Sequence, residues 1–350
     1  MTHFPSEPSH SDRPGFVAKI LIIVVVVAVL LATWKIAPVF MLGFGGIVVA
    51  VALNNIATPL ALRTGLPHTA SLGLTVVGLT LLGIIFFALF GARAADQFAR
   101  LIEELPQAWT NMEGWLESWP LGRWILVMVD DVVRGGGTAL FNAVPIAGGL
   151  LGGIANAVLI VVIGIYLAAD PISYRMGVLR LLPPARRARA DEMLGETASA
   201  LRKWLTAMSL DMLFLGTITG IGLWLVGVPL YFALGVLSGL SVFVPYLGPL
   251  VATVPGLLLA LSVSPQLALY ALIVYVVTQQ LEGNISLPLL QRWTVQMPPA
   301  LMLLAIVGFG LLFGLWGVLL ATPLAVATIT IIRMAYVEDV LENPTAHGAE

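Results

Sequence analysis

Long apolar runs separated by short polar stretches dominate the hydropathy pattern of this chain. A helix needs about 20 apolar residues to cross a hydrocarbon core of roughly 30 Å. The pattern therefore predicts membrane-spanning helices at residues 17–35, 38–60, 68–92, 146–169, 205–227, 265–282, 298–314 and 315–336. The expected fold class is an all-α polytopic membrane protein with about eight transmembrane helices.

The apolar stretch over residues 228–264 does not predict a single helix. Four prolines interrupt it, namely Pro229, Pro245, Pro249 and Pro255. Proline removes a backbone donor and breaks a helix, and the apolar segments flanking Pro245 to Pro249 are each short for a full span. Two short spans are the alternative, but the shortness favours a Pro/Gly-broken re-entrant hairpin. Transporters use such broken helices to bring free backbone groups to a solute.

Two polar segments divide the chain. Residues 93–145 contain apolar positions at helical spacing, followed by tryptophans at positions 109, 115, 119 and 124. This pattern predicts an extracytoplasmic amphipathic helical region at the membrane surface, with an external ligand-binding domain as the alternative. Residues 170–204 predict a short helix, a break at Pro183-Pro184 and a longer helix. Three helices are expected within 17–92, a permease core within 205–338, and cytoplasmic tails at 1–16 and 339–350, of which the first is disordered.

Composition agrees with a membrane protein. Hydrophobic residues make up 59% of the 350 residues and charged residues only 10%, against about 25% charged in soluble domains. Mean hydropathy is +0.98. The formal net charge of -2 gives no argument for a nucleic-acid partner, and the absence of cysteine excludes thiol chemistry.

The distribution of lysine and arginine predicts orientation. Seven of these residues lie in the segment 170–204: Arg175, Arg180, Arg186, Arg187, Arg189, Arg202 and Lys203. Cytoplasmic loops hold the excess of positive charge, so this segment, and by counting spans both termini, are expected in the cytoplasm. These arginines either anchor the topology or bind anionic lipid headgroups.

Polar side chains cluster at the end of an apolar run in Thr278-Gln-Gln-Leu-Glu-Gly-Asn284. Such groups are costly in hydrocarbon and mark a pathway or site by default. The candidate residues there are Gln279, Gln280, Glu282 and Asn284, which either line a wet cavity or form interhelical hydrogen bonds. Asp211 is a further candidate, either as a coupling carboxylate or as an aspartate that snorkels toward Lys203. The broken segment adds Pro245, Tyr246, Gly248 and Pro249.

Enzymatic motifs are missing. The four histidines, His3, His10, His68 and His347, lie at tails or loop edges, and the chain contains no zinc-binding pattern, serine elbow or phosphate loop. We therefore expect no enzyme activity, no cofactor and no metal site. The leading hypothesis is a permease that exports a small polar solute through a cavity formed by the broken segment and the Gln280 to Asn284 cluster. The alternatives are a cation/proton antiporter using Asp211 or Glu282, and a scaffolding membrane protein.

Four sequence motifs resemble a known family. They are Gly222-Leu-Trp-Leu-Val-Gly-Val-Pro229, Val244-Pro-Tyr-Leu-Gly-Pro249, Gln280-Leu-Glu-Gly-Asn284 followed by Pro288, and Gly314-Leu-Trp-Gly-Val-Leu-Leu-Ala-Thr-Pro-Leu324. Together they resemble the autoinducer-2 exporter family of bacterial permeases. The resemblance implies about eight spans, cytoplasmic termini, assembly into a homo-oligomer with pentamers expected, and export of an autoinducer-2-like signal. Some members are similar in activity to sodium/proton antiporters.

Overall fold

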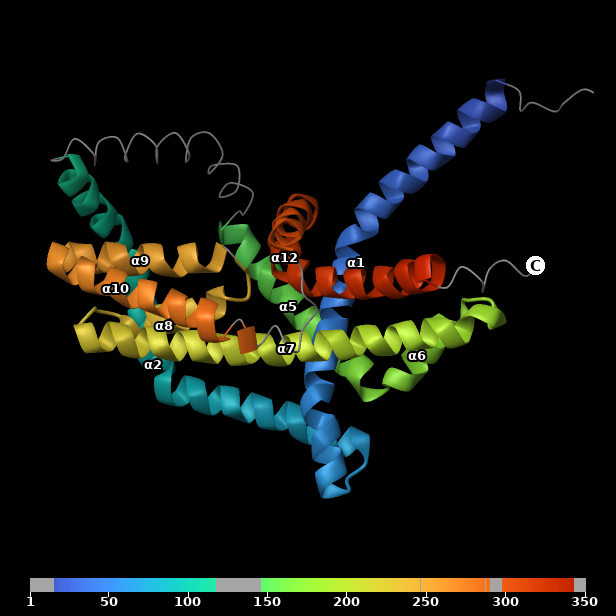
Figure 1. Cartoon of the computed structure of the whole chain (residues 1–350), viewed down its shortest axis with the longest axis horizontal. Helices are drawn as coiled ribbons and strands as arrows, with labels where there is room; N and C mark the ends of the chain where they lie inside the picture. Colours follow the sequence, from blue (N-terminus) through green and yellow to red (C-terminus); the bar gives the residue numbers. More distant parts are fainter. Residues whose placement is uncertain (1–15, 118–145, 246, 287, 290–297, 343–350) are drawn as a thin grey trace, which may run out of the picture.

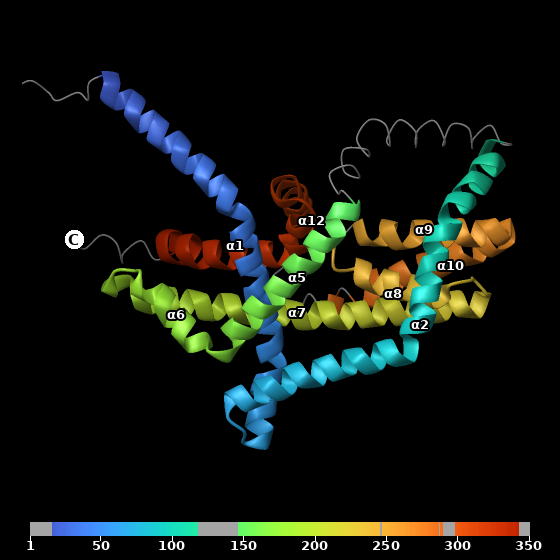
Figure 2. The same cartoon turned by 180° about the vertical axis from the view of Figure 1, so that it is seen from behind.

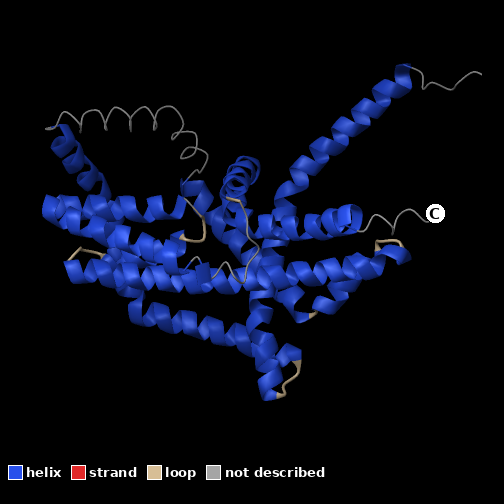
Figure 3. Ribbon diagram, viewed as in Figure 1, coloured by secondary structure: helices blue, strands red, loops and turns tan. Residues whose placement is uncertain are grey.

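The computed structural model describes residues 16–117, 146–245, 247–286, 288–289 and 298–342. Almost all of these residues are helical, and none of the described residues lies in a strand (Figure 3). Within them, five helices are apolar and long enough to cross a membrane: Lys35–Thr64, His68–Ile85, Gly152–Ala169, Pro184–Val226 and Pro299–Asp339. The expected all-α, multi-pass membrane fold is confirmed.

Helix α1 (Phe16–Thr64) joins the two spans expected at 17–35 and 38–60. The two apolar runs are separated only by Lys35-Ile-Ala-Pro38, in which Pro38 has no glycine, asparagine, aspartate or serine beside it to complete a tight turn. Proline bends a helix without necessarily ending it, and Figure 1 shows α1 changing direction along its length. A continuous helix offers no turn for two antiparallel crossings. The N-terminus was placed in the cytoplasm by counting these two crossings, so its location stays a prediction.

Helices α1, α2 (His68–Glu117) and α5 (Ile146–Ala169) form one part of the molecule (Figure 2). Helix α5 has the bounds expected for the span at 146–169. It approaches α1 closely at two glycines, where any side chain would be too large. A methyl group at Gly46 would collide with Ile163, and one at Gly164 would collide with Val49. Small residues permit such backbone approach between membrane helices. Residues 118–145, which include Trp119 and Trp124, lie outside the described residues.

Helix α6 (Pro171–Arg180) begins directly after Asp170, which caps it. The Asp170 carboxylate accepts a hydrogen bond from the Ser173 N–H at 3.1 Å, and hydrogen bonding by Ser173 holds the pKa of Asp170 below its usual range. After Pro183, helix α7 (Pro184–Val226) runs for 43 residues, or about 65 Å. The expected short helix, break and longer helix are present, but the longer helix continues unbroken through the span expected at 205–227.

Two short helices, α8 (Tyr231–Ser241) and α9 (Leu247–Val263), occupy the proline-rich stretch. Their 11 and 17 residues correspond to about 17 and 26 Å, both less than a hydrocarbon core. Gln97 of α2 accepts a hydrogen bond at 3.1 Å from the Ala233 N–H and so satisfies one free amide at the start of α8. The predicted break is therefore present between α8 and α9, while the re-entrant path of these two helices stays a prediction.

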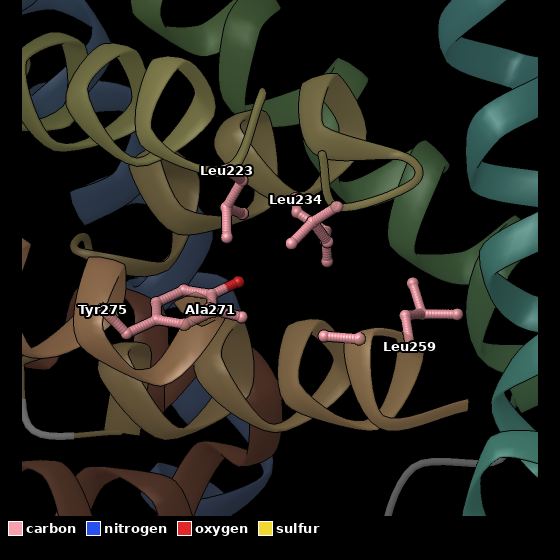
Figure 4. Close-up of a cluster of buried hydrophobic side chains, with 7 residues drawn as sticks. Leu223, Leu234, Leu259, Ala271 and Tyr275 are labelled. Atoms are coloured by element: carbon pink, nitrogen blue, oxygen red, sulfur yellow. The ribbon is translucent and has the colours of Figure 1, made fainter. Parts of the chain in front are cut away.

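Helices α7, α8, α9 and α10 (Pro265–Leu281) pack together as a second bundle (Figures 1 and 2). Helix α1 crosses α7, and α2 packs across α9 and α8. Every one of the four helices contributes to its core, which contains Leu223, Val228, Leu234, Leu259, Ala260, Ala271 and Tyr275. Figure 4 shows five of these side chains converging between the helices. A hydrogen bond of 2.9 Å from Asn55 to the Thr206 hydroxyl joins α1 to α7.

Helix α12 (Pro299–Ile332) covers most of the two spans expected at 298–314 and 315–336. Gly314 has φ 62° and ψ -143°, which is not helical, so the chain changes direction where the second span was expected to begin. The π-helix η3 (Arg333–Glu342) follows. Arg189 of α7 holds it through Glu338 at 3.1 Å and Asp339 at 2.7 Å. The C-terminal end of the described chain therefore lies beside the basic start of α7.

Candidate functional site

Asp211 is a buried carboxylate on α7, with only 4% of its surface exposed. It accepts a hydrogen bond from the hydroxyl of Ser286. Nine residues separate it from Arg202, which corresponds to about 14 Å along the helix axis. Within the part of the chain that the structure describes, Asp211 forms no ion pair with Arg202 or Lys203. The carboxylate thus points into the bundle, where its partner is a hydroxyl.

Glu282 lies next to Asp211 at the end of α10. The helix gives way at this point to η2 (Glu282–Ser286), a π-helical turn. Gln279 donates a hydrogen bond of 3.0 Å to the Glu282 carboxylate. Both side chains are half-buried, and Glu282 is close enough to Asp211 for their charges to interact. Tertiary structure therefore brings together Asp211, Gln279 and Glu282 from the predicted candidates.

Gln280 and Asn284 lie on the other side of this helix end. Both side chains are exposed, and the Asn284 amide donates a hydrogen bond of 2.8 Å to the backbone carbonyl of Gln280. An amide bound to the preceding turn satisfies the local backbone instead of facing Asp211. The predicted cluster is thus divided, with Gln279 and Glu282 on the half-buried side and Gln280 and Asn284 on the exposed side.

Ser286 completes the polar cluster and was not among the candidate residues predicted from the sequence. Its side chain is buried and it makes the direct hydrogen bond to Asp211. Ser286 follows Glu282 by four residues, so the helical spacing that links the other candidates would have included it. We call Asp211, Gln279, Glu282 and Ser286 the carboxylate cluster.

The remaining candidates lie where α8 gives way to α9: Pro245 is in the turn, and Gly248 and Pro249 are in the first turn of α9. Gly248 is buried and donates a backbone hydrogen bond of 2.9 Å to Val244, and a methyl group there would collide with the Ser241 carbonyl. Pro245 and Pro249 are half-buried, and Tyr246 lies outside the described residues. Across the described part of the chain, no hydrogen bond joins Pro245, Gly248 or Pro249 to the carboxylate cluster.

An aromatic contact places this turn relative to Asp211. Phe243 packs edge-to-face on Trp204 of α7, with 5.7 Å between ring centroids. Trp204 precedes Asp211 by seven residues, or about 10 Å along α7. The turn and the carboxylate cluster therefore contact neighbouring positions of one helix, and a movement of the hairpin would act on α7 close to Asp211.

Tyr275 connects the carboxylate cluster to α9. Its hydroxyl donates a hydrogen bond of 3.2 Å to the Ala252 carbonyl, and its ring packs where a side chain at Gly256 would otherwise lie. Figure 4 shows the ring directed inward from α10. Gly256 thus makes room for the Tyr275 ring, which sets the distance between α9 and α10. Tyr275 lies one helical turn before Gln279 on α10.

A groove of about 550 Å³ lies between α7 and α8, on the face of α7 opposite Asp211. Its floor consists of Gly216, Gly220, Gly235 and Gly239, and its walls include Ile221, Trp224, Tyr231 and Leu240. None of the lining side chains is charged, and no predicted site residue is among them. The groove is therefore chemically distinct from the carboxylate cluster.

The carboxylate cluster offers two acidic groups, a hydroxyl and an amide in an otherwise apolar bundle. Oxygen acceptors of this kind can bind the hydroxyl groups of a polar solute, a proton or a monovalent cation. Among the described residues, no group of three or more histidine, aspartate or glutamate side chains is arranged to hold a metal ion. The groups present are therefore suited to binding a polar solute or a monovalent cation.

Comparison with known proteins finds one family along almost the entire chain. The family model described as AI-2E family transporter matches residues 20–336. YrrI of Bacillus subtilis (strain 168), named as a candidate transport protein, is 30% identical over 290 residues, which cover 77% of this chain and 80% of YrrI.

Two further relatives have names of the same kind. A candidate transport protein of Thermotoga maritima is 26% identical over 261 residues, covering 74% of this chain and 78% of the relative. PerM of Escherichia coli (strain K12), named as a candidate permease, is 31% identical over 205 residues, covering 57% of this chain and 55% of PerM. None of these names states a solute.

Proposed function

Because the chain belongs to the AI-2E family of transporters, we propose that it exports a small polar organic solute, with a furanone signal of the autoinducer-2 type as the first candidate. The observation that supports this proposal is the carboxylate cluster. Asp211 is buried in an apolar bundle, receives a hydrogen bond from Ser286 and lies beside the Gln279–Glu282 pair. Four polar side chains would be costly on helices that contact only lipid, so their presence favours a role in binding a solute.

The chemistry of the carboxylate cluster suits a solute with several hydroxyl groups. Carboxylates accept hydrogen bonds from hydroxyls, whereas the Gln279 amide and the Ser286 hydroxyl can both donate and accept. These groups would replace the water that a polar solute loses on entering the membrane. The solute is therefore proposed to lie between α7 and the end of α10.

Movement of the α8–α9 hairpin provides the proposed change of access. Both helices are short for a full span, which supports a re-entrant hairpin. The hairpin meets α7 at Trp204 through Phe243 and meets α10 at Tyr275 through Ala252. We propose that it moves against α1, α2 and α5 and so opens the cluster to each side in turn. Helix α2, which packs against both α9 and α8, would then be the surface along which the hairpin moves.

Efflux from proteoliposomes loaded with autoinducer-2 tests the proposal. The wild type, Asp211→Asn, Ser286→Ala and Glu282→Gln are compared, with Glu196→Gln as the control because Glu196 is an exposed carboxylate on the same helix α7. A hydrogen bond to a charged group contributes about 1.5–3 kcal/mol, or a factor of about 10 to 150 in affinity. We expect losses of that size for Asp211→Asn and Glu282→Gln and none for the control. A wild type that moves neither autoinducer-2 nor other small polar solutes would refute the proposal.

A cation/proton antiporter is the second candidate, and the proximity of Asp211 to Glu282 favours it. Two neighbouring carboxylates can share one proton or hold a monovalent cation in its place. The same proteoliposomes distinguish the two functions when a pH-sensitive dye is enclosed. Proton flux that follows a sodium gradient and disappears in Asp211→Asn supports antiport, whereas solute efflux without a sodium gradient contradicts it.

We also propose that the protein resides in the inner membrane of a bacterium, with the basic segment in the cytoplasm. The arginines of residues 170–204 support this orientation. Contacts of Arg189 with Glu338 and Asp339 would then place the C-terminus in the cytoplasm too. A homo-oligomer, with a pentamer as the first candidate, is proposed from the family alone.

A further inference from the structure

Helix α6 exposes an apolar face outside the membrane spans. Tyr174, Val178 and Leu181 have exposed fractions of 48%, 51% and 85%. Their spacing of four and three residues places them on one side of the helix. On the opposite side, Leu179 is buried against the rest of the protein with 5% exposed, whereas Ile172 and Met176 are 73% and 47% exposed. A helix that meets only water would not present three large apolar side chains along one face.

Unpaired positive charge accompanies this apolar face. Arg180 at the end of α6 and Arg186 at the start of α7 are exposed, and their guanidinium groups form no hydrogen bond or ion pair with any described residue. The acidic residues nearby are already engaged: Asp191 binds Arg175, and Glu192 binds Arg189. Arg187 donates to the backbone carbonyls of Leu182 and Arg180. The free charge at this corner is therefore cationic.

The position of α6 along the chain supplies the third observation. Only Asp170 separates it from Ala169, where the apolar span Gly152–Ala169 ends. A helix that begins within one residue of the hydrocarbon edge starts in the headgroup region. Apolar side chains on one face, free arginines and this location are the features of a helix that lies in the membrane interface.

We propose that α6 is an interfacial helix that binds anionic phospholipids. Tyr174, Val178 and Leu181 enter the boundary between headgroups and acyl chains, and Arg180 and Arg186 pair with lipid phosphates. Charge complementarity decides between possible occupants of this surface, because two unpaired arginines favour an anionic bilayer over a second apolar protein surface. The inference does not depend on which solute the protein transports.

A single fluorescent label tests the location of α6. The chain has no cysteine, so Gly177→Cys gives one reactive site. Gly177 lies three residues after Tyr174 and four before Leu181, and nothing lies within 4 Å of a side chain added there. The full protein, labelled with an environment-sensitive dye, is reconstituted into phosphatidylcholine vesicles containing increasing fractions of brominated phosphatidylglycerol. We expect blue-shifted emission and strong quenching at low fractions of the anionic lipid.

Charge variants in the same labelled background test the lipid preference. An arginine near an anionic surface contributes about a factor of five in binding. Arg180→Gln and Arg186→Gln should therefore each require about five times more brominated phosphatidylglycerol for half-maximal quenching. Arg180→Lys should retain the wild-type value and shows that a loss is not due to misfolding. Arg100→Gln on α2 is the matched control, since Arg100 pairs with Asp96 far from α6 in the chain.

Three results would overturn the proposal. Emission of a fully hydrated dye, with quenching by iodide and not by bromolipid, would mean that α6 lies in water. A dye shielded from both iodide and bromolipid would mean that protein covers this face. Equal quenching by brominated phosphatidylcholine and phosphatidylglycerol would contradict the role of the arginines.

Discussion

Replacement of Gly235 by alanine should separate α7 from α8. Two pairs of glycines, Gly216 with Gly220 and Gly235 with Gly239, face each other where these helices cross. A methyl group at Gly235 would lie 2.7 Å from the Gly220 Cα and 2.9 Å from the Gly216 carbonyl oxygen. Both atoms belong to the backbone of α7 and cannot rotate away. Ordinary carbon contacts are about 3.5–4.0 Å, so the helices must move apart by roughly 1 Å.

The size of the effect follows from two opposing contributions. Overpacking of a well-packed interior costs about 1–3 kcal/mol. Alanine also gains about 0.5–1 kcal/mol over glycine inside a helix. Gly78→Ala on the apolar part of α2 is the matched control, because nothing lies within 4 Å of a methyl group there. Since the helical gain is common to both variants, their difference in unfolding free energy isolates the collision at Gly235 and should be about 1–3 kcal/mol.

Unfolding in mixed micelles measures this difference. The purified protein is titrated with sodium dodecyl sulfate, and tryptophan fluorescence reports unfolding, aided by Trp224 in the wall of the groove. Gly78→Ala should be as stable as the wild type or slightly more stable, and Gly235→Ala less stable. If Gly235→Ala and Gly78→Ala unfold within about 0.5 kcal/mol of each other, the backbones of α7 and α8 do not approach as closely as described.

Two other predictions concern the C-terminal region. Gly314→Ala should destabilise the protein by about 1–3 kcal/mol, because φ 62° with ψ -143° is a region that only glycine occupies easily. Gly308→Ala in the same helix is the control, since nothing lies within 4 Å of the added methyl group. The control should not lower the unfolding free energy in the same titration. Arg189→Gln should release η3 from α7, since Arg189 bonds Glu192, Glu338, Asp339 and the Met334 carbonyl, and hydrogen exchange should become faster over residues 333–342. Unchanged exchange there, or an equal increase in Arg100→Gln, would show that Arg189 does not hold the C-terminal helix.

Local rules of backbone geometry explain why several breaks could be predicted. Pro183-Pro184 separates α6 from α7, Pro245 lies in the break between α8 and α9, and Gly314 divides α12. Pro249, by contrast, lies in the first turn of α9 and does not end it. Proline lacks a donor and glycine permits positive φ, so their effect depends little on distant residues. Pro38 shows the limit of this reasoning. Without turn residues beside it, α1 continued as one helix where two spans were expected.

The extent of the helices was harder to predict than their existence. Helix α7 combines the predicted cytoplasmic helix with the span at 205–227, and α2 combines the span at 68–92 with the start of the amphipathic region. A change from polar to apolar residues marks a change of solvent, but it does not interrupt the hydrogen bonds of a helix. Composition therefore located the membrane boundary without ending the helix there.

Sequence alone determined that this is an all-α membrane protein with a broken hairpin and a polar cluster near residue 282, because hydropathy and backbone geometry are local properties. Only the tertiary structure decided which polar groups meet. Asp211 and Ser286 are 75 residues apart and form a hydrogen bond, while Gln280 and Asn284, adjacent to Glu282 in sequence, lie on the exposed side. The packing of α7, α8 and α10 against one another sets these partners. The spacing of residues within a single helix cannot specify which residues of another helix they will meet.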